Sequence, residues 1–244
     1  MRVIAKLDVK PPCVVKPVHF EGLRKIGEPA DIARRYYEQG ADEIFYIDIV
    51  ASLYRRDVLY DQIRLASEHV FVPFAVGGGI RSVDDVSRAF HSGADKVALN
   101  TEVVQRDPEL IDRAARLFGS QAVVVNVEAK RWDRMWECYT DCGRERSGRN
   151  VIEWVREAEQ RGAGEILLQS VDRDGRRAGF DVDLIEQVKA TVSVPVIAAS
   201  GAGSVDDIVQ MARRARPDAV AVASVLHYGV CSVSDIKSAL KELE

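Results

Sequence analysis

Long apolar runs are missing from this sequence, and their absence excludes a helix that spans a membrane. No segment approaches the roughly 20 consecutive apolar residues that such a helix needs. The first apolar stretch after Met1 already contains Asp8, at a point where a secretory signal would stay uncharged. We therefore expect a cytoplasmic protein that makes no contact with a membrane.

Cysteine and histidine are scarce, with four of each among 244 residues. Cys13 and Cys231 are isolated, and Cys138 and Cys142 stand four positions apart in a polar segment. A zinc site would need two further ligands near that pair, and the histidines show no ligand spacing. In a reducing cytosol we expect four unpaired thiols, no metal site and no cofactor.

An excess of positive charge is also absent. Lysine and arginine number 34 against 38 acidic residues, which gives a formal net charge of −4. This balance offers no electrostatic reason to expect nucleic acid or an anionic membrane surface as a partner. The hydrophobic fraction of 47% is that of an ordinary globular protein with a sizeable core.

The sequence does contain one glycine-rich pattern that occurs twice. Residues 74–85 read FAVGGGIRSVDD, and residues 196–207 read VIAASGAGSVDD. Aligning Ser82 with Ser204 gives an offset of 122 residues, half of the chain. Two further pairs of segments keep nearly the same offset, 40–44 with 162–166 and 94–98 with 217–221. Three matches in register predict a two-fold half-barrel repeat, with halves of about 1–121 and 122–244.

Strand-like and helix-like segments alternate along the whole chain. We expect strands at 3–8, 43–48, 72–76, 96–100, 122–127, 165–170, 194–198 and 219–223. The expected helices are 30–40, 59–69, 83–92, 108–118, 151–161, 184–190, 205–215 and 233–243. Mostly apolar strands between helices indicate a parallel sheet that is buried on both faces. Eight such units in about 250 residues predict a single (β/α)8 TIM barrel over residues 1–244, of the α/β class.

Two segments interrupt this rhythm. An ordered loop is expected after the first strand, through Pro11, Pro12 and Lys16. Residues 131–149 place Trp132, Trp136 and Tyr139 among charges. We interpret the second segment as a hairpin-like insertion over the mouth of the barrel.

Residues that end the strands are the candidates for function, because the site of such a barrel lies in the loops that follow them. Glycines before a helix start let backbone N–H groups approach an anion. Tight turns alone are the alternative, but two such loops at symmetric positions favour phosphate binding. We expect one site from Gly78, Gly79, Asn100 and Thr101, and another from Asp174, Gly175, Gly201, Ala223 and Ser224. Asp48 and Gln169 end strands at the same mouth.

Two acids, Asp8 and Glu128, follow apolar strands on opposite sides of this mouth. Burial and each other's charge are expected to raise their pKa values toward a range useful for proton transfer. The alternative is local pairing with Lys10, Lys16 or Lys130. Between two phosphate sites, general acid–base work is favoured. The residues alone thus predict an enzyme that acts on a bis-phosphorylated or elongated phosphorylated small molecule.

Seven segments together resemble one known family: LDVK at 7–10, VVK at 14–16, FEGLR at 20–24, GGGIRS at 77–82, FGSQ at 118–121, VDRDG at 171–175 and ASV at 223–225. They are similar to the cyclase subunit of imidazole glycerol phosphate synthase, from histidine biosynthesis. The resemblance implies that ammonia from a glutaminase partner adds to a bis-phosphorylated ribulosyl aminoimidazole-carboxamide. Ring closure and cleavage then release imidazole glycerol phosphate and an aminoimidazole carboxamide ribotide.

The resemblance also implies roles for single residues. Asp8 falls on the family's first catalytic acid–base residue, and Lys16 on a loop lysine near the substrate. The glutaminase is expected to dock at the face where the strands begin. Four charges that begin strands match a ring that gates an ammonia path through the barrel in this family: Arg2, Glu43, Lys96 and Glu165. A salt-bridge ring that only closes the barrel is the structural alternative.

Several positions depart from the family's pattern. Glu128 stands where the second catalytic aspartate is expected, and its extra methylene moves the carboxylate by roughly 1.5 Å. A misplacement of about 1 Å can cost on the order of 10²-fold in rate. Gln169 replaces a threonine, residues 199–201 replace a serine-glycine-glycine run, and prolines at 11, 12 and 17 stand in a loop that usually carries glycines.

These departures leave two alternatives open. One is a paralogue that delivers ammonia to the acetamido group of a nucleotide sugar in surface-polysaccharide biosynthesis. The other is a non-catalytic activator of the glutaminase.

Overall fold

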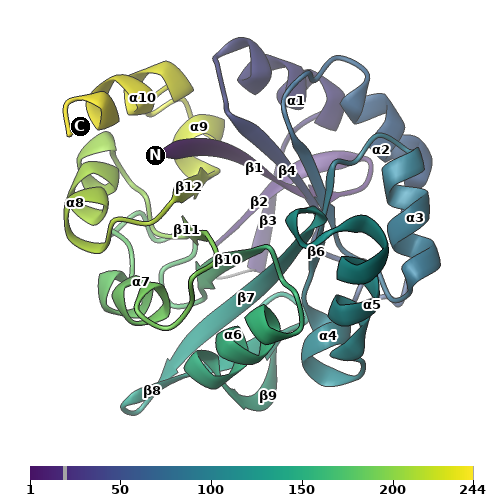
Figure 1. Cartoon of the computed structure of the whole chain (residues 1–244). Coiled ribbons are helices and arrows are strands. Elements are labelled where there is room, and N and C mark those ends of the chain that lie inside the picture. The colour runs from purple at the N-terminus through teal and green to yellow at the C-terminus, as the bar shows by residue number, and fades with distance from the viewer. Residues whose placement is uncertain (19–20, 244) are drawn as a thin grey trace.

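The computed structural model describes residues 1–18 and 21–243, in which helices surround a central barrel of strands (Figure 1). His19, Phe20 and Glu244 lie outside the described residues, so one residue of the FEGLR motif is not placed. Eight strands follow one another around the barrel: β1 (Arg2–Lys10), β4 (Glu43–Asp48), β5 (Phe74–Gly77), β6 (Lys96–Leu99), β7 (Val123–Trp132), β10 (Glu165–Ser170), β11 (Val196–Ala199) and β12 (Ala219–Val222).

Parallel pairing closes this sheet on itself. Strand β12 pairs with β1, and β7 pairs with β10, so each of the eight strands has a parallel neighbour on both sides. The predicted (β/α)8 TIM barrel is confirmed.

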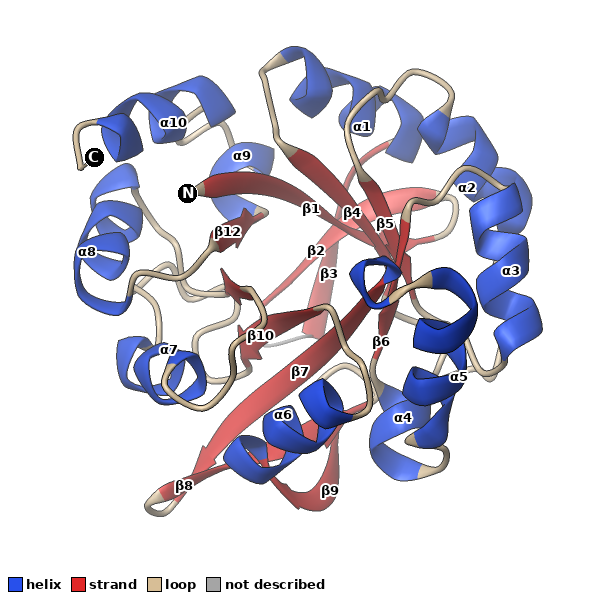
Figure 2. Cartoon of the chain, viewed as in Figure 1, coloured by secondary structure: helices blue, strands red, loops and turns tan. Residues whose placement is uncertain are grey.

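Helices cover the outside of the barrel (Figure 2). The expected ones are α1 (Pro29–Glu38), α2 (Tyr60–Ser67), α3 (Val83–His91), α5 (Glu109–Phe118), α6 (Val151–Gln160), α7 (Val182–Lys189), α8 (Val205–Ala215) and α10 (Val233–Lys241). Three short helices were not expected: α4 (Thr101–Gln105), η1 (Ser120–Ala122) and α9 (Ser224–His227). Among the described residues, no helix combines the length and the apolar character needed to cross a membrane.

The sequence repeat reappears in the way two helices begin. Ser82 caps α3 by accepting a hydrogen bond from the Asp85 N–H at 3.1 Å, and Ser204 caps α8 by accepting one from the Asp207 N–H at 3.2 Å. The side-chain oxygen of a serine satisfies a backbone donor that a helix start leaves unpaired. The two helices that follow the glycine-rich segments thus start in the same way.

Alternate residues of each strand face the inside and the outside of the barrel. Val3, Ala5 and Leu7 of β1 pack in the outer core, between sheet and helices. Ile4 packs in the inner core with Phe45, Val124 and residues of the other strands. Arg2, Lys6 and Asp8 share the parity of Ile4 and therefore lie on the inner face of β1.

The segment after β1 is more regular than expected. In place of an ordered loop, β2 (Cys13–Val18) and β3 (Glu21–Gly27) form an antiparallel hairpin. Strand β1 continues two residues past Asp8 and pairs with β2, with Lys10 opposite Cys13. The loop prediction was wrong because Pro11 and Pro12 only form the turn, whereas Val14 and Val15 favour a strand.

The predicted insertion at 131–149 is a hairpin. Strand β7 runs on to Trp132, β8 (Met135–Thr140) returns along it, and β9 (Glu145–Asn150) pairs with β8. Trp136 donates a hydrogen bond from Nε1 to Asp181 Oδ2, at 2.9 Å, which fixes the hairpin to the start of α7.

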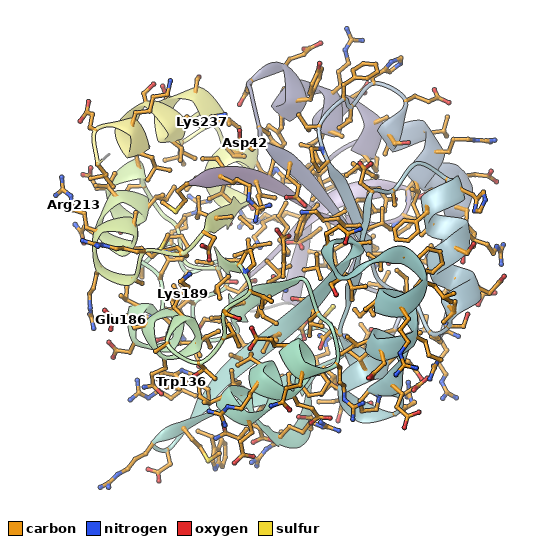
Figure 3. All side chains as sticks on the ribbon, in the orientation of Figure 1. Asp42, Trp136, Glu186, Lys189, Arg213 and Lys237 are labelled. Atoms are coloured by element: carbon orange, nitrogen blue, oxygen red, sulfur yellow. The ribbon has the colours of Figure 1, made fainter. Side chains whose placement is uncertain are left out.

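The last helix ties the end of the chain back to its first half. Lys237 of α10 lies beside Asp42, the residue before β4 (Figure 3), with 2.6 Å between Nζ and Oδ1.

Candidate active site

Two cavities open where the barrel strands end. The first has a volume of about 300 Å³, and its lining includes Asp48, Gly78, Gly79, Asn100, Thr101 and Glu128. The second has a volume of about 30 Å³, and its lining includes Lys16, Asp174, Gly175, Gly201, Ala223 and Ser224. Each predicted phosphate site is therefore brought together in space, in its own cavity. Gln169 and Lys6 line both.

Both glycine-rich loops require glycine at one position. Gly78 has a φ of +95°, and a Cβ there would lie 2.2 Å from the carbonyl oxygen of Asp48. Gly201 has a φ of +109°, and a Cβ would lie 2.3 Å from the carbonyl oxygen of Gly179. A side chain would collide with backbone at either place, so both loops lie close against the neighbouring strand-end loop.

Asp8 lies at the centre of a chain of charges. Its Oδ1 accepts a hydrogen bond from Lys6 Nζ, and its Oδ2 accepts one from Lys16 Nζ at 3.3 Å. Lys16 Nζ also reaches Asp174 Oδ1, at 3.2 Å, so that the β2 hairpin is tied to the loop after β10. The expected local pairing with Lys16 is therefore present, and all four side chains are buried.

The expected rise in the pKa of Asp8 was wrong. Burial by itself would raise this pKa, but the ammonium groups of Lys6 and Lys16 outweigh burial and lower the pKa to about 2. A nearby cation favours the charged form of a carboxyl group. Asp8 is thus an ionised carboxylate throughout the neutral range.

Glu128 has the opposite electrostatic environment. Burial raises its pKa to about 7, although the hydrogen bond from the Gly143 N–H and the charge of Lys6 act against this rise. The Gly143 N–H donates to Glu128 Oε2 at 2.7 Å, from the turn between β8 and β9. A group with a pKa near 7 can both donate and accept a proton at neutral pH.

The turn between β8 and β9 lies over the first cavity, as predicted for the insertion. The Asp141 N–H donates to Thr101 Oγ1 at 3.1 Å, and Cys142 Sγ donates to the Ile49 carbonyl oxygen at 2.6 Å. Gln105 of α4 also donates to Thr140 Oγ1. The hairpin thus joins the loops that follow β4 and β6.

Asp48 and Gln169 line the first cavity but are held by other residues. Asp48 accepts the Val50 N–H at 3.1 Å on Oδ1 and is paired with Arg56 on Oδ2. Burial raises the pKa of Asp48, against these two contacts. Gln169 Nε2 donates to Asn126 Oδ1 at 2.7 Å, which fixes its amide between the two cavities.

The four charges predicted for the opposite end of the barrel form a closed ring. Arg2 lies 2.8 Å from Glu43 Oε2 and 2.6 Å from Glu165 Oε1. Lys96 Nζ lies 2.9 Å from a carboxylate oxygen of each of the same two glutamates. Each cation therefore bridges the same pair of carboxylates, at the face where the strands begin.

The sequence prediction missed Lys6. The signal was present, since a lysine inside an apolar strand with the parity of Arg2 and Asp8 must face the barrel interior. The four cysteines are free thiols. Across residues 1–18 and 21–243, no three side chains of His, Cys, Asp or Glu gather so as to hold a metal ion.

Comparisons with known proteins identify relatives over most of this chain. A family model described as "Histidine biosynthesis protein" matches residues 2–232. The imidazole glycerol phosphate synthase subunit HisF of Myxococcus xanthus is 47% identical, over 99% of this chain and 95% of the relative. The HisF subunit of Legionella pneumophila is 51% identical over 85% of this chain and 98% of the relative. That of Streptococcus mutans is 45% identical over 99% and 96%.

Proposed function

The chain belongs to the histidine biosynthesis protein family, and the relatives named above are HisF subunits of imidazole glycerol phosphate synthase. On this premise we propose that the chain is the ammonia-dependent cyclase of that synthase. Its substrate is a bis-phosphorylated ribulosyl aminoimidazole-carboxamide. Its products are imidazole glycerol phosphate and an aminoimidazole carboxamide ribotide.

The observation that carries this proposal is the pair of cavities that meet at Lys6 and Gln169. A substrate with a phosphate at each end can place one phosphate beside Gly78 and the other beside Gly201. Its central part then lies between Asp8 and Glu128, where the bonds change.

The two acids suit different steps. Addition of ammonia to a carbonyl group and loss of water require a proton on the departing oxygen, and ring closure requires removal of a proton. Glu128 is the group that transfers these protons, because its pKa of about 7 makes both of its forms available. Asp8 is already ionised, so it accepts hydrogen bonds and stabilises positive charge that develops on the attacking nitrogen.

The ring of Arg2, Glu43, Lys96 and Glu165 fits an ammonia gate at the other end of the barrel. The partner in this proposal is a glutaminase that docks at the face where the strands begin and releases ammonia at the ring. Free thiols at all four cysteines fit a cytoplasmic enzyme. The relatives do not favour the nucleotide-sugar paralogue, because HisF subunits match nearly the whole chain.

The test is turnover of the bis-phosphorylated substrate by the purified chain with a high concentration of ammonium salt at alkaline pH. Ammonium replaces the glutaminase, so the chain is assayed alone. We expect steady turnover, and a loss of at least about 10²-fold in Asp8→Asn, since a positioned charge or acid–base group contributes about that much.

The control is Asp61→Asn, an exposed acid on α2, which should keep full activity. Inorganic phosphate binding by Asp8→Asn would show that its two cavities are intact. Absence of turnover in the unchanged chain would refute the cyclase. Full activity of Asp8→Asn would refute the role of Asp8 in it.

A further inference from the structure

Lys6 is a buried cation in the wall of the barrel, with 5% of its surface exposed. Its neighbours Ala5 and Leu7 face the helices, and Lys6 faces the interior, between Ile4 and Asp8 on the same face of β1. Burying an ammonium group is costly unless it is paired. An apolar residue at this position would pack the barrel interior without burying a charge. Packing alone therefore does not explain the lysine.

The pairing of Lys6 is with Asp8, at Oδ1. The other cation on this carboxylate, Lys16, divides its contacts between Asp8 and Asp174 at 3.3 and 3.2 Å. Lys6 is anchored in the barrel strand itself, whereas Lys16 is carried by the β2 hairpin. Lys6 is therefore the rigid partner of the Asp8 carboxylate.

Lys6 also lies where the two cavities adjoin. Among the residues that the structure describes, Gln169 is the only other one that lines both cavities. The charge of Lys6 also lowers the pKa of Glu128, the second acid at the mouth. The ammonium group is thus close to both acids and to the middle of any ligand that extends from one cavity to the other.

We propose that Lys6 is a positioning residue of the active site, whose ammonium group, at the boundary between the two cavities, holds the Asp8 carboxylate in place through an ion pair. The charged and titratable groups facing this pair come from several elements. They are Lys16 of β2, Glu128 of β7, Cys142 of the β8–β9 turn, Asp174 after β10 and His227 of α9. The role in turnover rests on the proposed cyclase, but the effect on Asp8 does not.

The first measurement follows the Asp8 carboxyl group in the free protein by ¹³C NMR, with the signal assigned from Asp8→Asn. In the unchanged chain we expect this signal to stay at its ionised position down to about pH 4, near the ordinary midpoint for aspartate. In Lys6→Met the signal should titrate above that pH, because burial then acts against one cation fewer. Lys10→Met, which removes an exposed lysine of the same strand, should behave as the unchanged chain.

The second measurement compares kcat and KM over a range of pH with ammonium as the nitrogen source. Lys6→Met should lose at least about tenfold in kcat with KM within about twofold, the pattern for an interaction made mainly in the transition state. Its acid limb should move to higher pH. Lys6→Gln is a second variant in case the methionine variant does not fold.

An Asp8 signal that stays ionised in folded Lys6→Met or Lys6→Gln would overturn the inference, whatever the activity. Equal kcat and an unmoved acid limb would also overturn it. If the unchanged chain does not turn over the substrate, the proposed cyclase fails, while the NMR titration still decides the role of Lys6.

Discussion

Asp8 and Glu128 are both buried in barrel strands, yet the charges around them differ. Asp8 contacts two ammonium groups, whereas the hydrogen-bond donors to Glu128 are the Gly143 N–H and the Asn100 side chain, which carry no charge. The number of direct cationic partners therefore decides which acid keeps its proton near neutral pH. Each acid follows an apolar run, which the sequence shows. Their protonation depends on Lys6 and Gly143, whose side-chain and backbone contacts only the folded chain shows.

The buried Glu128 predicts that stability falls as pH rises. Its folded pKa of about 7 exceeds the ordinary value of 4.5, so the folded state holds a proton that the unfolded chain releases. This contribution to stability is full below pH 4.5 and is lost as pH rises through 7, with a size on the order of 3 kcal/mol. Urea unfolding at pH 5 and pH 8 measures the difference. Glu128→Gln should remove most of it.

A control for this prediction is Glu153→Gln, which changes an exposed glutamate of α6. It should leave the pH dependence as it is. An equal decline with pH in Glu128→Gln and in the unchanged chain would show that other groups cause it.

At the scale of elements, the barrel strands and their helices follow from the local sequence pattern. Of the two hairpins, one was predicted from this pattern and the other was not. The hairpin at 131–149 was predictable, because a segment with Trp132, Trp136 and Tyr139 among charges interrupts the alternation of strands and helices. The β2–β3 hairpin was not predicted, since its prolines suggested a loop. This segment forms strands because its backbone continues the hydrogen-bonded pairing with β1, from Asp8 opposite Val15 onward. Pairing of this kind is not visible in the local sequence.

The loop between β5 and α3 predicts a strong effect of Gly78→Ala. The new Cβ would meet the Asp48 carbonyl oxygen at 2.2 Å, so the loop must shift away from the cavity. We expect binding of inorganic phosphate, measured by calorimetry, to weaken by at least about tenfold, the effect of losing about 1.4 kcal/mol of binding free energy.

The matched control is Gly40→Ala, at a φ of +85° with open space around the new Cβ. Alanine at this left-handed backbone position lowers stability by about 1 kcal/mol, but its Cβ collides with nothing. Phosphate binding should be unchanged in it. Equal binding by Gly78→Ala and Gly40→Ala would mean that the β5–α3 loop does not hold the anion.

At the scale of the whole molecule, the barrel joins two ends with different chemistry. The closed ring of two cations and two glutamates lies at the face where the strands begin, and the paired cavities lie at the other. Between them the inner core is filled by apolar side chains such as Ile4 and Phe45. The closed fold was predictable from the order of strands and helices. The half-barrel repeat and the roles of the residues at the two ends stay predictions.

The ring predicts a selective effect of Lys96→Met. If ammonia passes the ring, turnover with glutamine and the glutaminase partner should fall about tenfold, within the usual range of coupling between sites. Turnover with ammonium salt, supplied directly at the mouth, should stay within about twofold of the unchanged chain. The assay compares the two nitrogen sources on the same complex.

Two variants sharpen this comparison. Lys96→Arg keeps a cation between the two glutamates and should recover part of the glutamine-driven rate. Arg64→Met, which removes an exposed cation of α2, should change neither rate. A parallel loss with both nitrogen sources in Lys96→Met would indicate damage to the fold and not to a gate.

The unequal size of the two cavities has a consequence for how a ligand can lie in the mouth. Two identical halves would offer two equivalent binding sites, and a ligand could then bind in either of two orientations. Here one cavity has a volume of about 300 Å³ and the other about 30 Å³, and the turn between β8 and β9 lies over the larger one alone. The two ends of an unsymmetrical ligand are therefore not interchangeable in this site. Such a ligand would then bind in a single orientation, with the same end in the larger cavity each time.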